Sequence, residues 1–158
     1  QENQPTAQFY HVSVDQQFPY RLYSGQQDNS SVSIASRTDG GSIGLRDWEE
    51  SAGCESANIG VGKSGRYAYG GCYQGLINEL DTETGRTRAI MVHPAMNLTE
   101  RTDSTKYRFN WTAPILVSQH DERTIYYGGN RLFRTTDRGT TWAEISPDLT
   151  KNDRARQG

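Results

Sequence analysis

The chain has 158 residues, of which 33% are hydrophobic, with 16 glycines and 9 tyrosines. Its 17 basic and 19 acidic residues are scattered and give a net charge of −2, so no basic stripe for nucleic acid is present. No run of about 18 apolar residues exists to cross a membrane. This composition is typical of a turn-rich all-β protein whose strands are built from Tyr, Thr, Ser and Val.

The sequence begins with a polar lead-in, residues 1–8, that contains no apolar signal segment. Either such a segment has been removed or the chain is an internal piece of a longer protein. Short strand patterns separated by turn residues predict a first four-stranded unit over residues 9–50. Its four expected strands lie at 9–14, 20–25, 31–36 and 43–48, the last of them poorly defined.

Two further units repeat this pattern. The second unit, residues 51–92, is expected to contain strands at 57–61, 66–71, 76–81 and 86–92. A polar insertion without a strand pattern, residues 93–107, precedes the third unit, residues 108–150, with strands expected at 114–118, 124–128, 132–136 and 141–145. A polar tail, residues 151–158, ends the sequence. Long irregular loops on a rigid scaffold, such as this insertion, often carry function or contact a neighbour.

A Tyr-x-Gly signature occurs once in each unit, at Tyr23-Ser24-Gly25, Tyr69-Gly70-Gly71 and Tyr127-Gly128-Gly129. Four short strands per unit at roughly 40 to 50 residues is the period of a β-propeller blade. We therefore predict an all-β portion of a β-propeller with about three four-stranded antiparallel blades. Because complete propellers have about four to eight blades, we expect an incomplete ring. The remaining blades of a longer parent chain, or other copies, would close it.

The third unit contains the most informative motif, Thr135-Thr136-Asp137-Arg138-Gly139-Thr140-Thr141-Trp142. It fits [Ser/Thr]-x-Asp-x-Gly-x-[Ser/Thr]-Trp, the pattern called an Asp box or bacterial neuraminidase repeat. Asp137 can accept hydrogen bonds from backbone N–H groups of a turn, and Gly139 can adopt positive φ. Thr135 and Thr141 flank the turn, and Trp142 can pack beside it. These residues predict a structural turn between two strands.

Two cysteines, Cys54 and Cys72, lie in Gly-rich surroundings. They could form one disulfide in an oxidising compartment, which would close a loop of moderate length. The alternative is two unpaired thiols in a reduced protein. Two cysteines alone do not decide between these states.

Several segments resemble one family. These are Gly25–Ser31 around Gln26-Gln27-Asp28-Asn29, Tyr107–Ile115, Thr124–Arg134, and Ser146–Thr150 after the Asp box. They are similar to secreted bacterial Asp-box propeller proteins, often labelled glycosyl hydrolase or sortilin-like. The resemblance implies a secreted or periplasmic protein in which the propeller belongs to a larger polypeptide. The group is similar both to xyloglucan-hydrolysing two-propeller enzymes and to sortilin ectodomains, so the fold leaves the function open.

The polar cluster after Gly25 holds the first candidate site. Asp28 is the candidate catalytic residue, as a general acid or base, and Gln27 and Asn29 are candidate ligand-binding residues. Glycosidases need two carboxyl groups on either side of the scissile bond. The resemblance implies that the two come from separate propellers, so this chain would contain one at most. The simpler interpretation is an Asx turn that joins two strands.

Two aromatic residues are candidates for ligand contacts. Trp48 lies beside acidic residues, a pairing that suits a carbohydrate subsite but also a solvated turn. Trp111 could form a binding platform with Tyr107 and Phe109, although packing between blades explains these residues equally well. The three histidines, His11, His93 and His120, lie far apart without ligand spacing, so no metal site is expected. No phosphate loop or dinucleotide fingerprint occurs, so no cofactor is expected.

The leading functional prediction is a binding scaffold for glycan or protein on a secreted Asp-box propeller. One alternative is part of a xyloglucanase-like glycoside hydrolase whose second carboxylate lies outside this chain. Another is a sortilin-like module that binds peptides. Polysaccharide or peptide is accordingly the expected partner, and the enzymatic status stays open.

Overall fold

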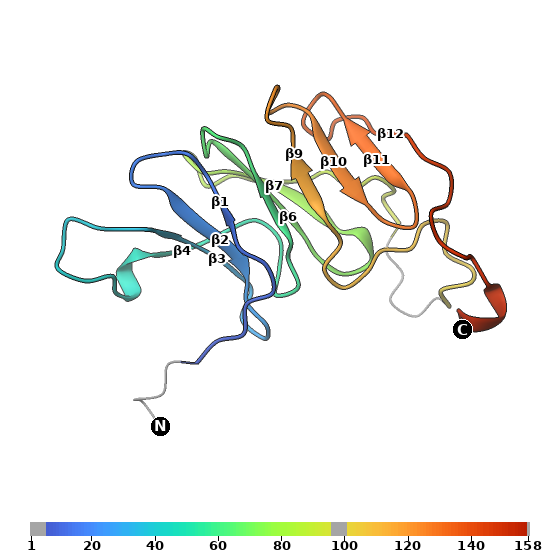
Figure 1. Cartoon of the computed structure of the whole chain (residues 1–158), viewed down its shortest axis with the longest axis horizontal. Coiled ribbons are helices and arrows are strands. Elements are labelled where there is room, and N and C mark those ends of the chain that lie inside the picture. The colour runs from blue at the N-terminus through green and yellow to red at the C-terminus, as the bar shows by residue number, and fades with distance from the viewer. Residues whose placement is uncertain (1–5, 96–100, 158) are drawn as a thin grey trace.

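The computed structural model describes residues 6–95 and 101–157 (Figure 1). Strands β1 to β12 form three four-stranded antiparallel sheets, and three short 3₁₀ turns accompany them. The prediction of an all-β chain with three four-stranded antiparallel sheets is confirmed. Parts of the expected lead-in, insertion and tail, at 1–5, 96–100 and 158, lie outside the described residues.

The first sheet differs from the prediction in its first strand, which starts four residues later than expected, and in its last strand. It contains β1 (Ser13–Val14), β2 (Arg21–Gly25), β3 (Ser31–Ala35) and β4 (Trp48–Glu50), in that order. The fourth strand was expected at 43–48, which is wrong because the 3₁₀ turn η1 (Leu45–Asp47) occupies the middle of that range and the strand begins only at Trp48. The Asp47 carboxylate accepts the Gly44 N–H at 2.7 Å, and this local bond closes the turn before the strand begins.

The second and third sheets follow the prediction to within three residues at each strand end. The second contains β5 (Ile59–Val61), β6 (Tyr67–Gly71), β7 (Ile77–Asp81) and β8 (Thr87–Ala89), with η2 (Tyr73–Gly75) between β6 and β7. The third contains β9 (Ile115–Val117), β10 (Ile125–Gly128), β11 (Leu132–Thr135) and β12 (Ala143–Glu144), and η3 (Arg154–Arg156) follows it. In each sheet the strands pair in chain order.

The three sheets stand side by side (Figure 1). Contacts join β1 to β5 and β5 to β9, so the first strands of consecutive sheets are neighbours. The fourth strands, β4, β8 and β12, form the opposite edges of their sheets. This is the arrangement of propeller blades, with the first strand of each blade nearest the axis. We call the sheets blades 1, 2 and 3.

The tyrosines of the Tyr-x-Gly signature form the centre of the contacts between blades. Tyr23, Tyr69 and Tyr127 lie on β2, β6 and β10, and each side chain is at most 1% exposed. Burial raises the pKa of all three hydroxyls. The Tyr23 hydroxyl donates to the Asp15 carboxylate at 2.8 Å, and the Tyr127 hydroxyl donates to the Leu76 carbonyl of blade 2 at 3.3 Å. Tyr23 faces blade 2 and Tyr69 faces blade 3, whereas Tyr127 faces back toward blade 2, so the repeat marks buried interface positions but not the same sheet face in every blade.

Two glycines allow the backbone of blade 1 and blade 2 to meet the segment that connects them. A Cβ at Gly25 would lie 2.6 Å from the Ala57 nitrogen, and a Cβ at Gly70 would lie 2.1 Å from the Ala52 carbonyl carbon. Both Ala52 and Ala57 are fully buried. Any side chain at either glycine would therefore push the connecting segment away from the sheets.

The turn between β11 and β12 contains the predicted Asp-box residues. The Asp137 carboxylate accepts the Thr141 N–H at 2.9 Å and the hydroxyls of Thr135 and Thr141, each at 2.7 Å. The Thr135 hydroxyl in turn accepts the N–H groups of Asp137 and Gly139, at 3.2 and 2.8 Å. Gly139 has φ +82°, and Arg138 also lies in the left-handed region with φ +56°.

This turn also fastens blade 3 to blade 2. The Trp142 indole N–H donates to the Ile90 carbonyl at 2.7 Å, and a Cβ at Gly139 would lie 2.6 Å from the Ile90 Cβ. The Arg138 guanidinium lies 4.0 Å from the centre of the Tyr67 ring. Trp142 is thus a packing residue between blades rather than a contact for a ligand.

A buried carboxylate adds an ionic contact beneath the same turn. Glu79 on β7 is 5% exposed and pairs with Arg88 at 3.1 Å and with Arg138 at 3.7 Å. Arg88 also donates to the Arg138 carbonyl at 2.7 Å. One acidic residue of blade 2 is therefore matched by two cations, one from its own blade and one from the turn of blade 3.

The glycine contacts predict a selective effect on stability. Gly70→Ala should lower the free energy of unfolding by about 3 kcal/mol, because the new Cβ overlaps backbone. Gly41→Ala is the matched control: no atom lies within 4 Å of a Cβ there, and the change should stay within about 1 kcal/mol. Urea unfolding followed by circular dichroism measures both. Equal stabilities of the two variants would contradict this packing.

The hydrogen bonds of Asp137 in the turn of blade 3 predict that the protein loses thermal stability at low pH. Hydrogen bonds from the Thr141 N–H and from the hydroxyls of Thr135 and Thr141 lower the pKa of Asp137 to about 2. Because this folded pKa lies below the unfolded value of about 3.9, the stabilisation is complete above pH 4 and is lost as the pH falls through about 2. The Tm should therefore fall over that interval. Asp137→Asn should make the fall smaller.

Thermal melts between pH 7 and pH 2 test this expectation. Some acid sensitivity should remain in Asp137→Asn, because hydrogen bonds from Thr150, followed by those from Asn130 and Arg108, also lower the pKa of Asp148. Asp39→Asn, in the exposed loop between β3 and β4, is the control and should keep the wild-type profile. An Asp137→Asn profile parallel to that of the wild type would disprove the proposed role of the carboxylate.

Candidate functional site

Most of the candidate residues lie at one end of the blades. Because consecutive strands of a meander run in opposite directions, the loops after the second strands and the segments entering the first strands share one end. They include residues 26–30, 51–58, 72–76, 108–114 and 129–131. We call this end the loop face. It contains Gln27, Asp28, Asn29 and Trp111 among the predicted residues.

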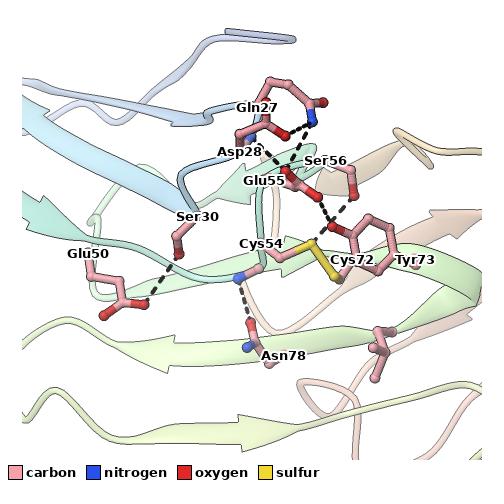
Figure 2. The surroundings of a disulfide bond; sticks show 12 residues. Gln27, Asp28, Ser30, Glu50, Cys54, Glu55, Ser56, Cys72, Tyr73 and Asn78 are labelled. Carbon is pink, nitrogen blue, oxygen red and sulfur yellow. Dashed lines mark hydrogen bonds between the residues drawn. A yellow bond between two sulfur atoms is a disulfide. The ribbon is translucent and has the colours of Figure 1, made fainter. Parts of the chain in front are cut away.

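Cys54 and Cys72 are joined by a disulfide on the loop face, with their Cα atoms 5.3 Å apart (Figure 2). Cys54 lies in the segment that connects blade 1 to blade 2, and Cys72 follows the last residue of β6. The Cys54 N–H also donates to the Gly71 carbonyl at 3.2 Å. The disulfide thus secures the connection between blades 1 and 2 to the second strand of blade 2.

Glu55, the residue after Cys54, connects three loops (Figure 2). One carboxylate oxygen accepts the Asp28 N–H at 2.6 Å and the Gln27 side-chain amide at 3.1 Å. The other oxygen accepts the Tyr73 hydroxyl. Sequence reasoning missed Glu55 because its role depends on contacts with residues distant in the sequence. The only signal in the sequence was that Glu55 directly follows Cys54, a cysteine that could form a disulfide.

The loop that carries Asp28 is a backbone turn. The Gln26 N–H donates to the Ser30 carbonyl at 2.9 Å, and the Asn29 N–H donates to the Gln26 carbonyl at 3.0 Å. Asp28 and Ser30 have φ of +62° and +65°. Among the described hydrogen bonds none joins a backbone N–H to the Asp28 or Asn29 side chain, so the predicted Asx turn is wrong. Backbone bonds and Glu55 close the turn instead.

This geometry leaves the Asp28 carboxylate exposed. It accepts the Gln27 amide at 2.7 Å, and the same amide nitrogen is 3.1 Å from Glu55. Two carboxylates, Asp28 and Glu55, therefore lie close together on the loop face. They differ in availability, because both oxygens of Glu55 already accept hydrogen bonds and Asp28 faces solvent.

The structure separates the two interpretations of the aromatic cluster before β9. Tyr107 and Phe109 pack in the core, with ring centres 4.8 Å from Phe133 and 4.9 Å from Tyr127. Trp111 is 45% exposed, and its ring centre lies 4.7 Å from that of Tyr73. Packing thus accounts for both residues, Tyr107 within blade 3 and Phe109 between blade 3 and Gly75 of blade 2, and Trp111 with the partly exposed Tyr73 forms an aromatic pair on the loop face.

Trp48 lies apart from this pair. It continues a cross-strand row of Val14, Leu22 and Ile34 on the open side of blade 1. Its side chain is 42% exposed, and its ring centre is 6.5 Å from that of Phe9. Trp48 therefore belongs to an uncovered blade surface, and the structure does not bring it together with Trp111.

Neither a metal site nor a membrane span is found in the part of the chain that the structure describes. Within residues 6–95 and 101–157 no group of three or more His, Cys, Asp or Glu side chains is arranged to bind a metal ion. No helix in these ranges is long and apolar enough to cross a bilayer.

The disulfide between Cys54 and Cys72 should contribute measurably to the stability of the protein. Replacing both cysteines, Cys54→Ser with Cys72→Ser, should lower the free energy of unfolding by about 2–4 kcal/mol, because the unfolded chain loses a covalent loop. Urea unfolding with and without dithiothreitol measures this. Reductant should destabilise the wild type to the level of the double variant and leave the double variant unchanged. A wild type indifferent to reductant would rule out the bond in solution.

Comparison with known proteins supports the fold and gives no family. No protein-family model matches the chain, and no curated protein matches it. Nine chains of solved structures match, among them U3-55K, a β-propeller of the WD40 type, with a TM-score of 0.51. The identity is 9%, and the match covers 87% of this chain and 41% of that one. The chain is therefore an incomplete propeller that spans less than half the length of this structural relative.

Proposed function

We propose that the chain is three blades of an Asp-box propeller from a secreted or periplasmic protein, and that its loop face is a binding scaffold for glycan or protein. One observation carries this proposal. Glu55 and the disulfide fix loops from blades 1 and 2 against one another, and Asp28, Asn29 and Trp111 stay exposed on the same loop face. Exposed polar and aromatic groups on fixed loops are the usual form of a binding surface.

The disulfide and the turn of blade 3 support the proposed location and the proposed family. A disulfide is most common in proteins of oxidising compartments, which favours a secreted or periplasmic protein. The turn that contains Asp137 and Gly139 uses each residue of the Asp-box pattern for a hydrogen bond, a positive φ or a packing contact. The open sides of blades 1 and 3 favour association with the remaining blades of a parent chain or with other copies.

A second candidate function, a glycoside hydrolase, is favoured by one specific feature. Asp28 is an exposed carboxylate next to a second carboxylate, Glu55, on the same face. Hydrolysis would use Asp28 as the acid or base and would need another carboxyl group free to act. Glu55 is already engaged by three donors, so that partner would come from outside this chain.

Asp28→Asn separates the two functions in the intact protein. The substitution keeps the backbone N–H that bonds Glu55, so the Tm should change by less than about 2 °C. For a scaffold, we expect no cleavage by the wild type and a weaker affinity for the bound oligosaccharide or peptide, by roughly fivefold. For a hydrolase, the wild type cleaves and Asp28→Asn does not.

Asp39→Asn, at the opposite end of blade 1, is the matched control and should bind like the wild type. Isothermal titration with neutral oligosaccharides and a peptide library measures affinity, and chromatography of the products measures cleavage. The scaffold proposal fails if the intact protein binds none of these ligands, or if Asp28→Asn and Asn29→Ala both retain the wild-type affinity.

A further inference from the structure

A shallow hollow of about 400 Å³ lies on the loop face at the junction of blades 2 and 3. Its lining has an unusual composition, because it combines three aromatic rings with two amides and contains no charged side chain. The lining residues are Tyr73, Gln74, Phe109, Asn110 and Trp111. Residues 72–76 of blade 2 supply one side, and the segment entering β9 of blade 3 supplies the other.

The blade 2 side of the hollow is held in place by its own turn. The Cys72 N–H donates to the Leu76 carbonyl at 2.8 Å, and the Leu76 N–H donates to the Tyr73 carbonyl at 3.1 Å. Gln74, inside this turn, has φ +55° and ψ +28°, an uncommon conformation for a residue of its type. The turn therefore fixes the backbone at Gln74 and leaves its side chain exposed.

Neighbouring residues of blade 2 hold the aromatic rings of the hollow in place. Tyr73 is held by the hydrogen bond from its hydroxyl to Glu55 and by the disulfide at the neighbouring residue, Cys72. Phe109 packs so closely on Gly75 that a Cβ there would lie 2.4 Å from its ring. Trp111 leans on Tyr73 at an angle of 37° and stays 45% exposed. A ligand would meet a preformed aromatic surface with little ordering cost.

This lining fits one class of ligand better than others. An aromatic face is apolar and carries partial negative charge, so it can lie against the C–H groups of a sugar ring. An amide carries both donors and an acceptor and can bond to hydroxyl groups in either direction. The absence of charge in the lining gives no preference for an anion or for a cationic peptide side chain.

We propose that this hollow is a subsite for one ring of a neutral saccharide, with Trp111 as the stacking residue and with Gln74 and Asn110 as hydroxyl contacts. The inference rests on the proposed binding function of the loop face and specifies its ligand. Trp111 lies beside Tyr73, whose hydroxyl bonds Glu55 next to Asp28. A saccharide chain seated in the hollow can therefore extend along the loop face toward Asp28.

The test compares Trp111→Ala with Trp48→Ala. The two tryptophans are almost equally exposed, 45% and 42%, but only Trp111 borders the hollow. Titration of the intact protein with hexasaccharides of β-1,4-glucan, β-1,4-mannan and α-1,4-glucan measures the affinity. Expression in a bacterial host keeps the Asn110-Trp111-Thr112 sequon free of glycan.

We expect binding of at least one hexasaccharide, with an affinity unchanged between 50 and about 500 mM salt because no ion pair contributes. Trp111→Ala should weaken it about tenfold or more. Trp111→Phe should recover part of the affinity, and Trp48→Ala should stay within about twofold of the wild type. The Tm of Trp111→Ala should stay within about 2 °C of the wild-type value, since the side chain is nearly half exposed and lies outside the buried core.

The outcomes separate this subsite from the wider binding function. Binding of a hexasaccharide that depends on Asp28 and Asn29 but not on Trp111 overturns the subsite and leaves the scaffold function standing. The same holds if none of the three sugars binds while a peptide binds through Asp28. An equal loss in Trp48→Ala and Trp111→Ala also overturns the subsite, because it would trace the effect to general destabilisation.

Discussion

The rest of the structure depends on the packing of each blade against the face of the next. A four-stranded sheet has two faces, and its apolar face is stable only when another layer covers it. Tyr23 and Tyr69 pack toward the following blade, Tyr127 packs back onto blade 2, and Gly25 and Gly70 allow the connecting backbone to approach. Three blades form two such interfaces, so one face of blade 1 and one face of blade 3 stay open.

The two open faces differ in chemistry. On blade 1 the row of Val14, Leu22, Ile34 and Trp48 crosses all four strands and is apolar throughout. On blade 3 the corresponding row contains Leu116, Tyr126, Arg134 and Ala143. A contact that joins unlike faces is heterologous and extends until the ring closes. Each open face is therefore expected to pack against a further blade.

The sequence predicted the blades well because their determinants are local. Each strand is bounded by turn residues, and the Tyr-x-Gly signature returns once per blade, so the main differences are confined to the first and last strands of blade 1. Before the last strand, a side-chain bond from Asp47 to Gly44 forms a 3₁₀ turn where a strand was expected. The candidate site was less predictable, since Glu55, Tyr73 and Gln74 gain their roles from contacts between loops of different blades. Asp28 and Trp111 were identified by residue type, but their partners were not.

The positions of the motif and of the site explain why the motif does not reveal the function. The turn with Asp137 joins the third and fourth strands of blade 3, whereas the loop face joins second strands to third strands. In a meander these turns lie at opposite ends. Asp137, Gly139 and Trp142 are used in hydrogen bonds and packing contacts that hold the turn and fix blade 3 on blade 2. Ligand specificity can then change through residues such as Trp111 and Gln74 without disturbing those contacts, which is how one propeller scaffold can support unrelated functions.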